Sequence, residues 1–191
     1  MANKIVCLVG MAGSGKSEVS EFFKGKGFEY IRFGQITLDE IKKRKLRISE
    51  KNEKIIREEL RNKHGMAAYA ILNMPKFDAA LARGNVIGDG LYSWDEYKVL
   101  KEKYGYNLII ISIYSSPKTR YERLVDRASR HGQDEKNIFR STTREETKKR
   151  DVSEIENLDK GGPIAMADYT IINEGSLADL RDNINAVFKN I

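Results

Sequence analysis

One stretch of this chain of 191 residues decides its fold: Gly10-Met11-Ala12-Gly13-Ser14-Gly15-Lys16-Ser17. It matches the pattern G-x-x-x-x-G-K-[ST] in full, and it lies between an apolar run over residues 4–9 and a helical pattern over residues 16–26. The glycines let the backbone curl so that successive N–H groups face one anion, and the start of the helix adds the positive end of its dipole. The whole stretch is therefore predicted to bind phosphate groups.

The last two residues of this loop carry the side-chain chemistry of the motif. Lys16 is a long point charge suited to the β- and γ-phosphates of a nucleotide, and the hydroxyl of Ser17 can bind Mg²⁺. The competing interpretation is an ordinary glycine-rich turn followed by a chance lysine. The strand-like run before the loop and the helix after it favour the phosphate site.

Composition limits the remaining classes of protein. Hydrophobic residues make up 40% of the chain and charged residues 32%, and the length suits a single domain over residues 1–191. The single cysteine excludes a disulfide framework, and the longest apolar runs are far shorter than the ~20 residues of a membrane span. We expect a cytoplasmic protein that does not enter a membrane.

Short apolar or β-branched runs alternate with helical patterns along the chain, and each of the three prolines, Pro75, Pro117 and Pro163, stands where a helix could begin or a loop could turn. The runs cover residues 4–9, 28–33, 86–87, 107–114 and 169–172. This alternation predicts an α/β fold of three layers, in which a five-stranded parallel sheet lies between helices. The loops that follow the strands should then face one cleft, because ligands of such sheets bind at the carboxyl ends of the strands.

Motifs of other phosphate-loop classes are incomplete or missing. Residues 62–65, Asn-Lys-His-Gly, lack the aspartate of the guanine-reading N-K-x-D pattern, and the L-S-G-G pattern of transporter ATPases is absent from the sequence. The apolar run over residues 108–113 ends in Tyr-Ser and not in the adjacent acids of helicases and motors. What remains is the layout of a small-molecule kinase.

Further stretches extend the similarity beyond the loop. The sequence Ala167-Asp168-Tyr169-Thr170-Ile171-Ile172-Asn173-Glu174-Gly175-Ser176-Leu177 follows the pattern of one group of kinases, as do residues 117–124 and Lys149-Arg150-Asp151. Together with the loop, they resemble dephospho-CoA kinases and the archaeal adenylate-kinase-related proteins, within the nucleoside-monophosphate-kinase branch of P-loop proteins. The resemblance implies strand order 2-3-1-4-5 and a small helical lid, placed here at residues 131–162. In this polar, charged segment we expect short scattered helices, and Gly161-Gly162-Pro163 could form the closing hinge of the lid. The resemblance also implies transfer of the γ-phosphoryl group of Mg-ATP to a nucleotide-like acceptor, either a nucleoside monophosphate or dephospho-CoA.

The resemblance also suggests roles for residues on the ATP side. Arg120, Arg123 and Arg150 would join Lys16 at the ATP phosphates, although each could equally be a surface arginine. Asp89 follows a strand and could hold a Mg²⁺-bound water or orient the acceptor, with a turn aspartate as the alternative. Asn173, Glu174 and Gly175 would border the adenine, or form a simple strand-to-helix turn, and both can hold together.

Residues on the acceptor side are expected on the helices of residues 35–83. Gln35 stands where the similar kinases place an aspartate that takes the proton of an accepting hydroxyl, and an amide cannot do so. This departure favours an acceptor that is already ionised, such as a nucleoside monophosphate. Asp39, one turn later, is a possible substitute base or an exposed acid. Arginine forks match phosphate oxygens, so the candidates to bind the acceptor phosphate are Arg44, Arg57 and Arg61.

Two other functions stay open at this point. The missing acid at Gln35 allows a switch or sensor that binds a nucleotide and hydrolyses ATP slowly. The net charge of +6 allows nucleic-acid binding, but aromatic residues are only 9% of the chain and form no spaced stacking series with Lys and Arg. A small-molecule nucleotide is therefore the expected partner, and the protein is expected to be a monomer or a homodimer.

Overall fold

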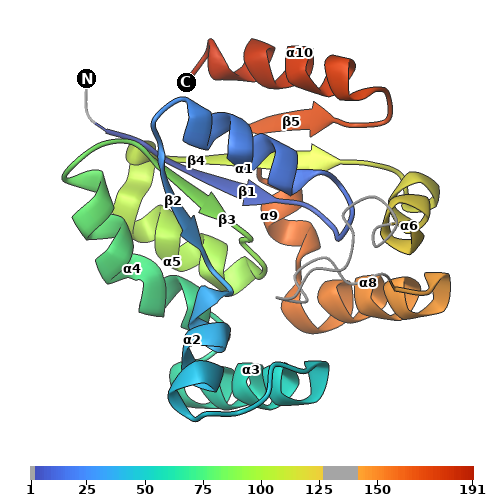
Figure 1. The fold of residues 1–191 in the computed structure, drawn as a ribbon. Coiled ribbons are helices and arrows are strands. Elements are labelled where there is room, and N and C mark those ends of the chain that lie inside the picture. Colours follow the sequence, from blue (N-terminus) through green and yellow to red (C-terminus); the bar gives the residue numbers. More distant parts are fainter. Residues whose placement is uncertain (1–2, 127–141) are drawn as a thin grey trace.

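The computed structural model describes residues 3–126 and 142–191. Its centre is a five-stranded sheet of order β2-β3-β1-β4-β5, in which every pair of neighbours is parallel (Figure 1). The strands are β1 (Ile5–Val9), β2 (Glu29–Arg32), β3 (Val86–Asp89), β4 (Leu108–Tyr114) and β5 (Tyr169–Ile172). The predicted α/β class, strand number and strand order are confirmed.

Helices cover both faces of the sheet, and further helices extend beyond its carboxyl edge (Figure 1). One face carries α1 (Lys16–Gly25) and α10 (Leu177–Phe188), and the other carries α4 (Ala68–Leu81), α5 (Trp94–Tyr104) and the short α9 (Gly161–Ala165). The remaining helices are α2 (Gln35–Lys43), α3 (Glu50–His64), η1 (Gly105–Asn107), α6 (Pro117–Val125) and α8 (Arg144–Leu158).

Alternation along β1 divides the core into two clusters. Ile5, Cys7 and Val9 are fully buried toward α4 and α5, while Val6 and Leu8 are fully buried toward α1 and α10. Successive side chains of a strand point to opposite faces, so a run that is apolar throughout needs cover on both sides. This central strand holds the beginning of the glycine-rich loop in a fixed place.

Two local features differ from the expectation. Pro75 lies inside α4, although prolines were expected only at helix starts or turns. A proline leaves the carbonyl four residues earlier without its helical partner. That residue is Ile71, whose side chain is 41% exposed, so water can reach this turn while Phe77 anchors the opposite side in the core. Packing against the core therefore outweighs the helix-breaking tendency.

The second difference lies in the charged segment predicted as the lid. Residues 131–141 lie outside the described part of the chain, including the predicted start of the lid at residues 131–132. Short scattered helices were expected over the rest, but α8 is a single helix of 15 residues. Thr143 and Glu146 form a reciprocal capping box at its start, which satisfies N–H groups that the first turn leaves unpaired. Within the described residues, no helix is long and apolar enough to cross a membrane.

Candidate nucleotide site

The glycine-rich loop joins the end of β1 to the start of α1, and three of its glycines have positive φ angles. These are 148° at Gly10, 80° at Gly13 and 101° at Gly15. A Cβ atom added at Gly10 would lie 2.4 Å from the carbonyl oxygen of Ile113, and one at Gly15 would lie 2.2 Å from Nδ2 of Asn173. Only glycine meets both demands, so the loop curls tightly against the ends of β4 and β5.

Lys16 folds back across this loop. Its Nζ donates hydrogen bonds to the carbonyl oxygens of Gly10 at 2.8 Å and Met11 at 3.0 Å. Burial and then the charge of Lys160 lower the pKa of Lys16, Asp89 and Glu154 oppose the shift, and the net result is a pKa of about 7. An ammonium that has given up most of its water beside a ring of backbone groups is well placed to meet an anion.

The floor beneath the loop is built from the ends of β4 and β5. Asn173 is buried, and its Nδ2 donates to the carbonyl oxygen of Ser14 at 2.8 Å. Arg123 donates to Oδ1 of Asn173 at 3.3 Å and to Oγ of Ser115 at 3.0 Å, and Ser115 donates to the Asn173 carbonyl oxygen at 2.5 Å. Asn173 and Arg123 thus lie together under the loop, which they hold in place.

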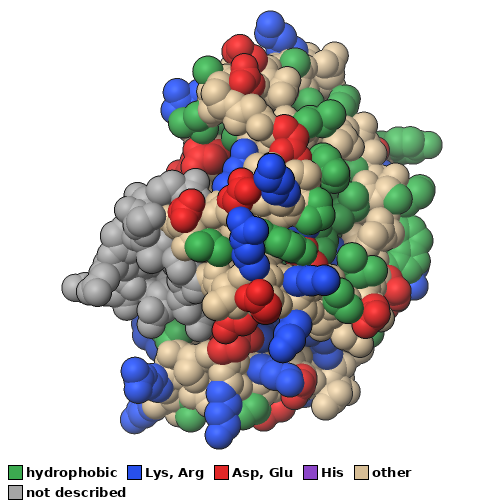
Figure 2. Space-filling view, turned by 90° about the vertical axis from the view of Figure 1, so that its right-hand side faces the viewer, with side chains coloured by type: hydrophobic (Ala, Val, Ile, Leu, Met, Phe, Trp, Pro, Cys, Tyr) green, Lys and Arg blue, Asp and Glu red, His purple; other side chains and the backbone are tan. Residues whose placement is uncertain are grey.

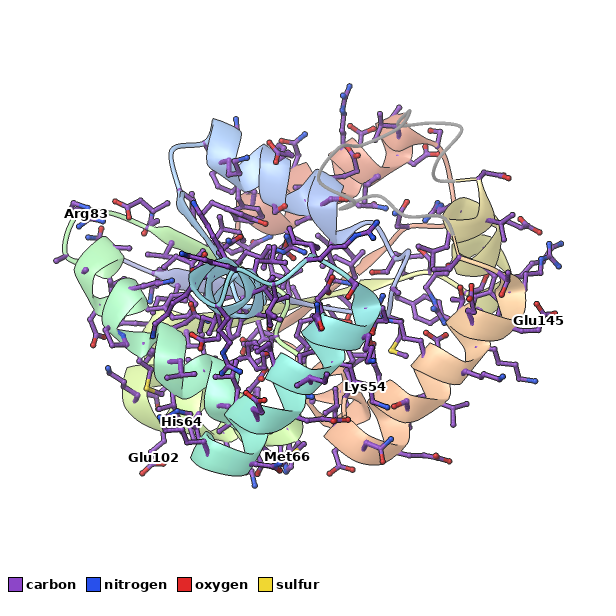
Figure 3. The ribbon with its side chains drawn as sticks, turned by 60° about the horizontal axis from the view of Figure 1, so that its bottom comes forward. Lys54, His64, Met66, Arg83, Glu102 and Glu145 are labelled. Carbon is purple, nitrogen blue, oxygen red and sulfur yellow. The ribbon has the colours of Figure 1, made fainter. Side chains whose placement is uncertain are left out.

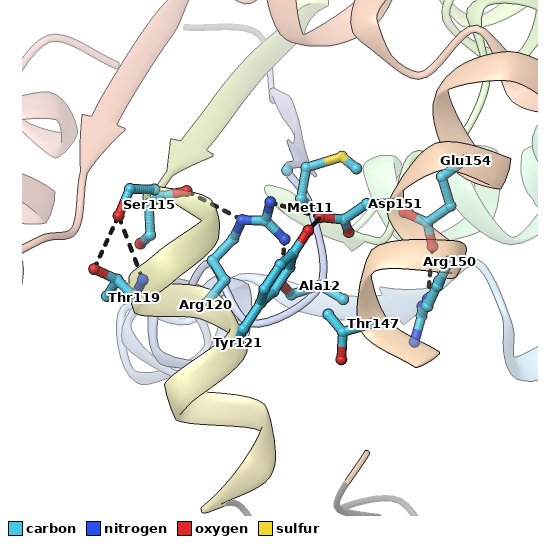
Figure 4. Close-up of polar contacts among 12 residues, drawn as sticks. Met11, Ala12, Ser115, Thr119, Arg120, Tyr121, Thr147, Arg150, Asp151 and Glu154 are labelled. Atoms are coloured by element: carbon cyan, nitrogen blue, oxygen red, sulfur yellow. Dashed lines mark hydrogen bonds and ion pairs between the residues drawn. The ribbon is translucent and has the colours of Figure 1, made fainter. Parts of the chain in front are cut away.

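Arg120 was expected at the ATP phosphates, and the structure instead surrounds its guanidinium with protein acceptors (Figure 4). Its side chain is buried. Nη1 donates to the carbonyl oxygen of Ala12 at 3.1 Å, Nε to that of Ser115 at 3.1 Å, and Nη2 to Oδ2 of Asp151 at 2.7 Å. Asp151 also accepts from the hydroxyl of Tyr121 at 3.1 Å. Arg120 therefore connects the loop, α6 and α8 as one unit.

Glu174 and Gly175 lie in the turn between β5 and α10. The carboxylate of Glu174 accepts from Oγ1 of Thr119 at 2.6 Å and from the backbone N–H and hydroxyl of Ser116. The hydrogen bond from Thr119 is the largest cause of the lowered pKa of Glu174, and the two hydrogen bonds from Ser116 lower it further. A Cβ atom at Gly175 would lie 2.5 Å from Oδ2 of Asp179. These residues fix a strand-to-helix turn next to the start of α6.

Asp89 ends β3 on the other side of the loop. Its Oδ2 accepts a hydrogen bond of 2.9 Å from the hydroxyl of Tyr30, which comes from the neighbouring strand β2. The charge of Asp89 acts on Lys16 across the carboxyl edge of the sheet. Asp89 is the last residue of β3, so it lies at the carboxyl edge of the sheet, and its role there stays a prediction.

Helix α8 and Lys160, which follows it, carry charged side chains near the same edge. Arg150 donates from Nε to Oε1 of Glu154 at 2.8 Å, and Lys160 donates from Nζ to Oε2 of Glu154 at 2.6 Å. Lys160 is only 1% exposed and lies over the ring of Tyr92, with its Nζ 4.5 Å from the centroid. The ring of Tyr92 therefore contacts Lys160, and the ring of Trp94 stacks on that of Tyr97, with the ring centroids 4.9 Å apart.

The acceptor candidates lie on α2 and α3. Gln35 donates from Nε2 to Oδ1 of Asp39 at 2.9 Å, so the amide and the acid contact each other. Arg44 pairs with Glu40 at 2.7 Å and links α2 to α3 through Glu59 at 2.6 Å. This guanidinium is 40% exposed and is held by carboxylates on both helices.

The other two acceptor arginines are four residues apart on α3, as predicted. Arg57 pairs with Glu50 at 2.6 Å and Glu53 at 3.5 Å. Arg61 lies over the ring of Tyr69 at 5.6 Å, and its Nε is buried with no hydrogen-bond partner among the described residues. Figure 3 shows the end of α3 at Lys54 turned toward α8, with the end at His64 turned away. Of the three arginines, Arg61 is the best placed to bind a further anion.

Comparison with known proteins agrees with this geometry. A family model described as an AAA domain matches residues 6–159. A UPF0200 protein of Thermococcus kodakarensis is 35% identical over 174 residues, which are 90% of this chain and 89% of that protein. The chain belongs to the UPF0200 family.

Solved structures of kinases share the fold of this UPF0200 protein. Shikimate kinase from Bacteroides thetaiotaomicron superposes with a TM-score of 0.58 at 13% identity, covering 98% of this chain and 97% of that one. Dephospho-CoA kinase from Campylobacter jejuni gives a TM-score of 0.52 at 17% identity, covering 100% and 98%. At these identities the likeness establishes the fold, which is that of the P-loop kinases, as the sequence resemblance implied.

The loop fits a nucleotide with its magnesium ion. Backbone groups curl around Lys16, and Ser17 is exposed at the first turn of α1. In the parts of the chain that the structure describes, no three His, Cys, Asp or Glu side chains gather as a metal site. Magnesium commonly keeps several waters and takes one or two protein ligands together with substrate phosphates. The Ser17 hydroxyl suits such a site.

Sequence reasoning missed Lys160 and Glu154 of this UPF0200 protein. Both lie in a charged segment, where helical spacing alone favours solvent-exposed side chains. Their burial depends on Tyr92, which comes from a distant part of the chain. The only local signal is Gly162, where a Cβ atom would lie 2.7 Å from the Trp94 ring, so that α9 needs a small residue to pack there.

Figure 2 shows the face that carries the outer ends of α6 and α8. Lys and Arg side chains alternate there with Asp and Glu. Such a mixed surface differs from the continuous basic stripe that follows a nucleic-acid backbone.

Proposed function

We propose that this protein transfers the γ-phosphoryl group of ATP to a small, nucleotide-like acceptor. The P-loop kinase fold supports the general part of this proposal, which is nucleotide-dependent phosphoryl transfer. The observations that support the finer part are Lys16 folded across the glycine-rich loop and, on the acceptor helices, Arg61, whose Nε has no hydrogen-bond partner among the described residues.

Phosphoryl transfer needs positioning and fixed positive charge more than covalent chemistry. The backbone N–H groups of residues 10–17 and the ammonium of Lys16 would bind the β- and γ-phosphates. Magnesium, held by Ser17, would neutralise developing negative charge. Arg150 would add its guanidinium from α8, whereas Arg120 and Arg123 act from below, by holding the loop and Asn173 in place.

The acceptor is proposed to be ionised before it reacts. The amide of Gln35 cannot remove a proton, and it is hydrogen-bonded to Asp39, whose other oxygen lies 3.8 Å from Lys76. A phosphate acceptor needs no such base, which favours a nucleoside monophosphate over the hydroxyl of dephospho-CoA. Arg61, with its unpartnered Nε, is the leading residue to bind that phosphate, while Arg44 and Arg57 shape the entrance.

The helices of residues 35–83 are accordingly proposed as the acceptor side, and residues 131–162 as a lid whose described part is α8 and the first residues of α9. Closure over the reacting groups would exclude water. Residues Gly161-Gly162-Pro163, predicted as the hinge of the lid, lie at the start of α9 and pack on Trp94. Any movement of α8 would therefore pivot near a fixed contact.

Gln35 also supports the second candidate function, a nucleotide-binding switch that hydrolyses ATP slowly and has no acceptor. The two are separated by measuring ADP release from Mg-ATP across a panel of nucleoside monophosphates and dephospho-CoA, beside Lys16→Ala. The kinase proposal expects one class of acceptor to raise the rate strongly, and Lys16→Ala to remove that increase while the fold persists. Equal slow rates with every acceptor would favour the switch.

A further inference from the structure

Two residues of α8, Arg150 and Glu154, and Lys160 just after the helix form a linked group of three charged side chains. The carboxylate of Glu154 accepts from Lys160 through one oxygen, at 2.6 Å, and from Arg150 through the other, at 2.8 Å. The two outer members differ in exposure: the side chain of Lys160 is 2% exposed, whereas that of Arg150 is 51% exposed. The three linked side chains thus extend from the core to the surface of the nucleotide site.

Lys160 is fixed from several sides. Its Nζ lies over the ring of Tyr92, and its backbone N–H donates to the carbonyl oxygen of Glu154 at 3.2 Å. The next turn is α9, where Gly162 contacts the ring of Trp94. Burial lowers the pKa of Lys160, and the charge of Glu154 opposes that shift. This lysine is therefore a rigid, dehydrated anchor.

Stability alone does not account for such a group. A buried ion pair contributes little compared with apolar side chains of the same volume. Here the second oxygen of Glu154 points outward to Nε of Arg150, and the terminal nitrogens of Arg150 bond to none of the described residues. Those nitrogens are the part of an arginine that forms a fork with phosphate.

Helix α8 lies beside the glycine-rich loop, because Asp151 of α8 pairs with Arg120, whose Nη1 donates to the carbonyl oxygen of Ala12 in the loop. The charges of Lys160, Glu154 and Arg150 all act on Lys16, the two cations lowering its pKa and Glu154 raising it. Burial raises the pKa of Glu154, but Lys160 and then Arg150 outweigh it and hold that pKa at about 2. Glu154 therefore stays a carboxylate, able to hold Arg150, at every ordinary pH.

We propose that Lys160 and Glu154 are positioning residues that fix the guanidinium of Arg150 toward the γ-phosphate of the bound nucleotide. The proposal rests on the proposed function, because it takes ATP as the ligand. Lys160 orients the carboxylate, the carboxylate holds Nε of Arg150, and the free fork faces the phosphate. Arg150 is thus held by a pair of charged residues, one of which, Lys160, is anchored in the core.

The test compares the affinities of Mg-ATP and Mg-ADP by calorimetry, because only ATP carries the γ-phosphate. Wild type, Lys160→Met, Glu154→Gln, Arg150→Ala and the double variant Lys160→Met/Arg150→Ala are titrated, and their melting temperatures are measured without nucleotide. Lys160→Arg keeps the charge and serves as the rescue variant. The matched control is Lys98→Met, which breaks a 2.6 Å ion pair with Asp95 on the exposed side of α5.

Each of the three single variants at the clamp should reduce the preference for ATP over ADP by about tenfold, which corresponds to one charge-assisted hydrogen bond. Because Lys160 acts through Arg150, the double variant should lose no more than Arg150→Ala alone. Lys160→Arg should restore most of the preference, and Lys98→Met should keep all of it.

Three results would overturn the proposal. An unchanged preference in Lys160→Met and Glu154→Gln, with lower melting temperatures, would assign them a purely structural role. Additive losses in the double variant would show that Lys160 acts independently of Arg150. If wild type binds neither nucleotide, the proposed function fails and this proposal with it. If Lys160→Met does not fold, the isosteric Glu154→Gln tests the proposal through the same ratio of Mg-ATP to Mg-ADP affinity.

Discussion

Replacing Arg120 by methionine tests whether this arginine holds the glycine-rich loop to α8. The substitution keeps much of the side-chain volume and removes the three hydrogen bonds of the guanidinium. It leaves Asp151, which is 6% exposed, with the hydroxyl of Tyr121 as its remaining partner among the contacts described above. Oδ1 of Asp151 already has no hydrogen-bond partner among the described residues, so no contact of this oxygen compensates for the loss of the Arg120 guanidinium.

The magnitude follows from burial. Removing one member of a buried ion pair costs about 3–5 kcal/mol, because the other charge stays dehydrated. For a protein of this length the melting temperature should fall by roughly 6–20 °C. Urea denaturation followed by circular dichroism measures the free energy of unfolding directly. The matched control is Arg144→Met, because Arg144 pairs with Glu122 between the same two helices at 3.8 Å but is 63% exposed. That variant should cost less than about 1 kcal/mol.

A second substitution separates the ion pair from general damage. In Arg120→Met/Asp151→Leu both charges of this pair are removed, so the double variant should be more stable than Arg120→Met alone. The reasoning is refuted if Arg120→Met costs no more than Arg144→Met, or if removing Asp151 as well makes the protein still less stable.

Two further predictions concern the loop itself. Gly15→Ala should lower the free energy of unfolding by about 1–3 kcal/mol, because φ is 101° there and the new Cβ meets Asn173. The control Gly25→Ala, which has open space around its Cβ, should leave the free energy of unfolding unchanged. Equal melting temperatures for the two variants would contradict this prediction. Mg-ATP binding at pH 8 should take up a proton, because Lys16, with its pKa near 7, is mostly neutral in the free protein and charged beside phosphates. Calorimetry in two buffers of different ionisation enthalpy should show this uptake at pH 8, little of it at pH 6, and none from this group in Lys16→Met; the same heat in both buffers at pH 8 would show that the lysine is already charged.

The sequence predicted the sheet and its loop because both depend on local patterns. Apolar runs of strand length identify β1 and β4, and spacing alone identifies residues 10–17. Strand order came from the resemblance to kinases, since periodicity does not contain it. The position of Asp89 at the carboxyl edge was also predicted from local information, because it stands at the end of a short apolar run.

The partners of the arginines could not be predicted in the same way. Helical spacing showed that Arg120 and Arg123 share a face of α6, but the acceptors of Arg120 come from the loop, the end of β4 and α8. Whether an arginine meets a ligand or a buried carboxylate depends on packing between distant segments. The same reason hides Lys160, whose burial depends on Tyr92.

The account depends most on Lys16 and its loop as a site for a nucleoside triphosphate. The direct measurement is a calorimetric titration of wild type and Lys16→Met with Mg-ATP at pH 6.5, where the pKa near 7 leaves the lysine mostly charged. Saturable binding by wild type, weakened at least about tenfold in a variant that melts as a folded protein, is the predicted result. No binding by wild type, or equal affinity in the two proteins, would contradict the account.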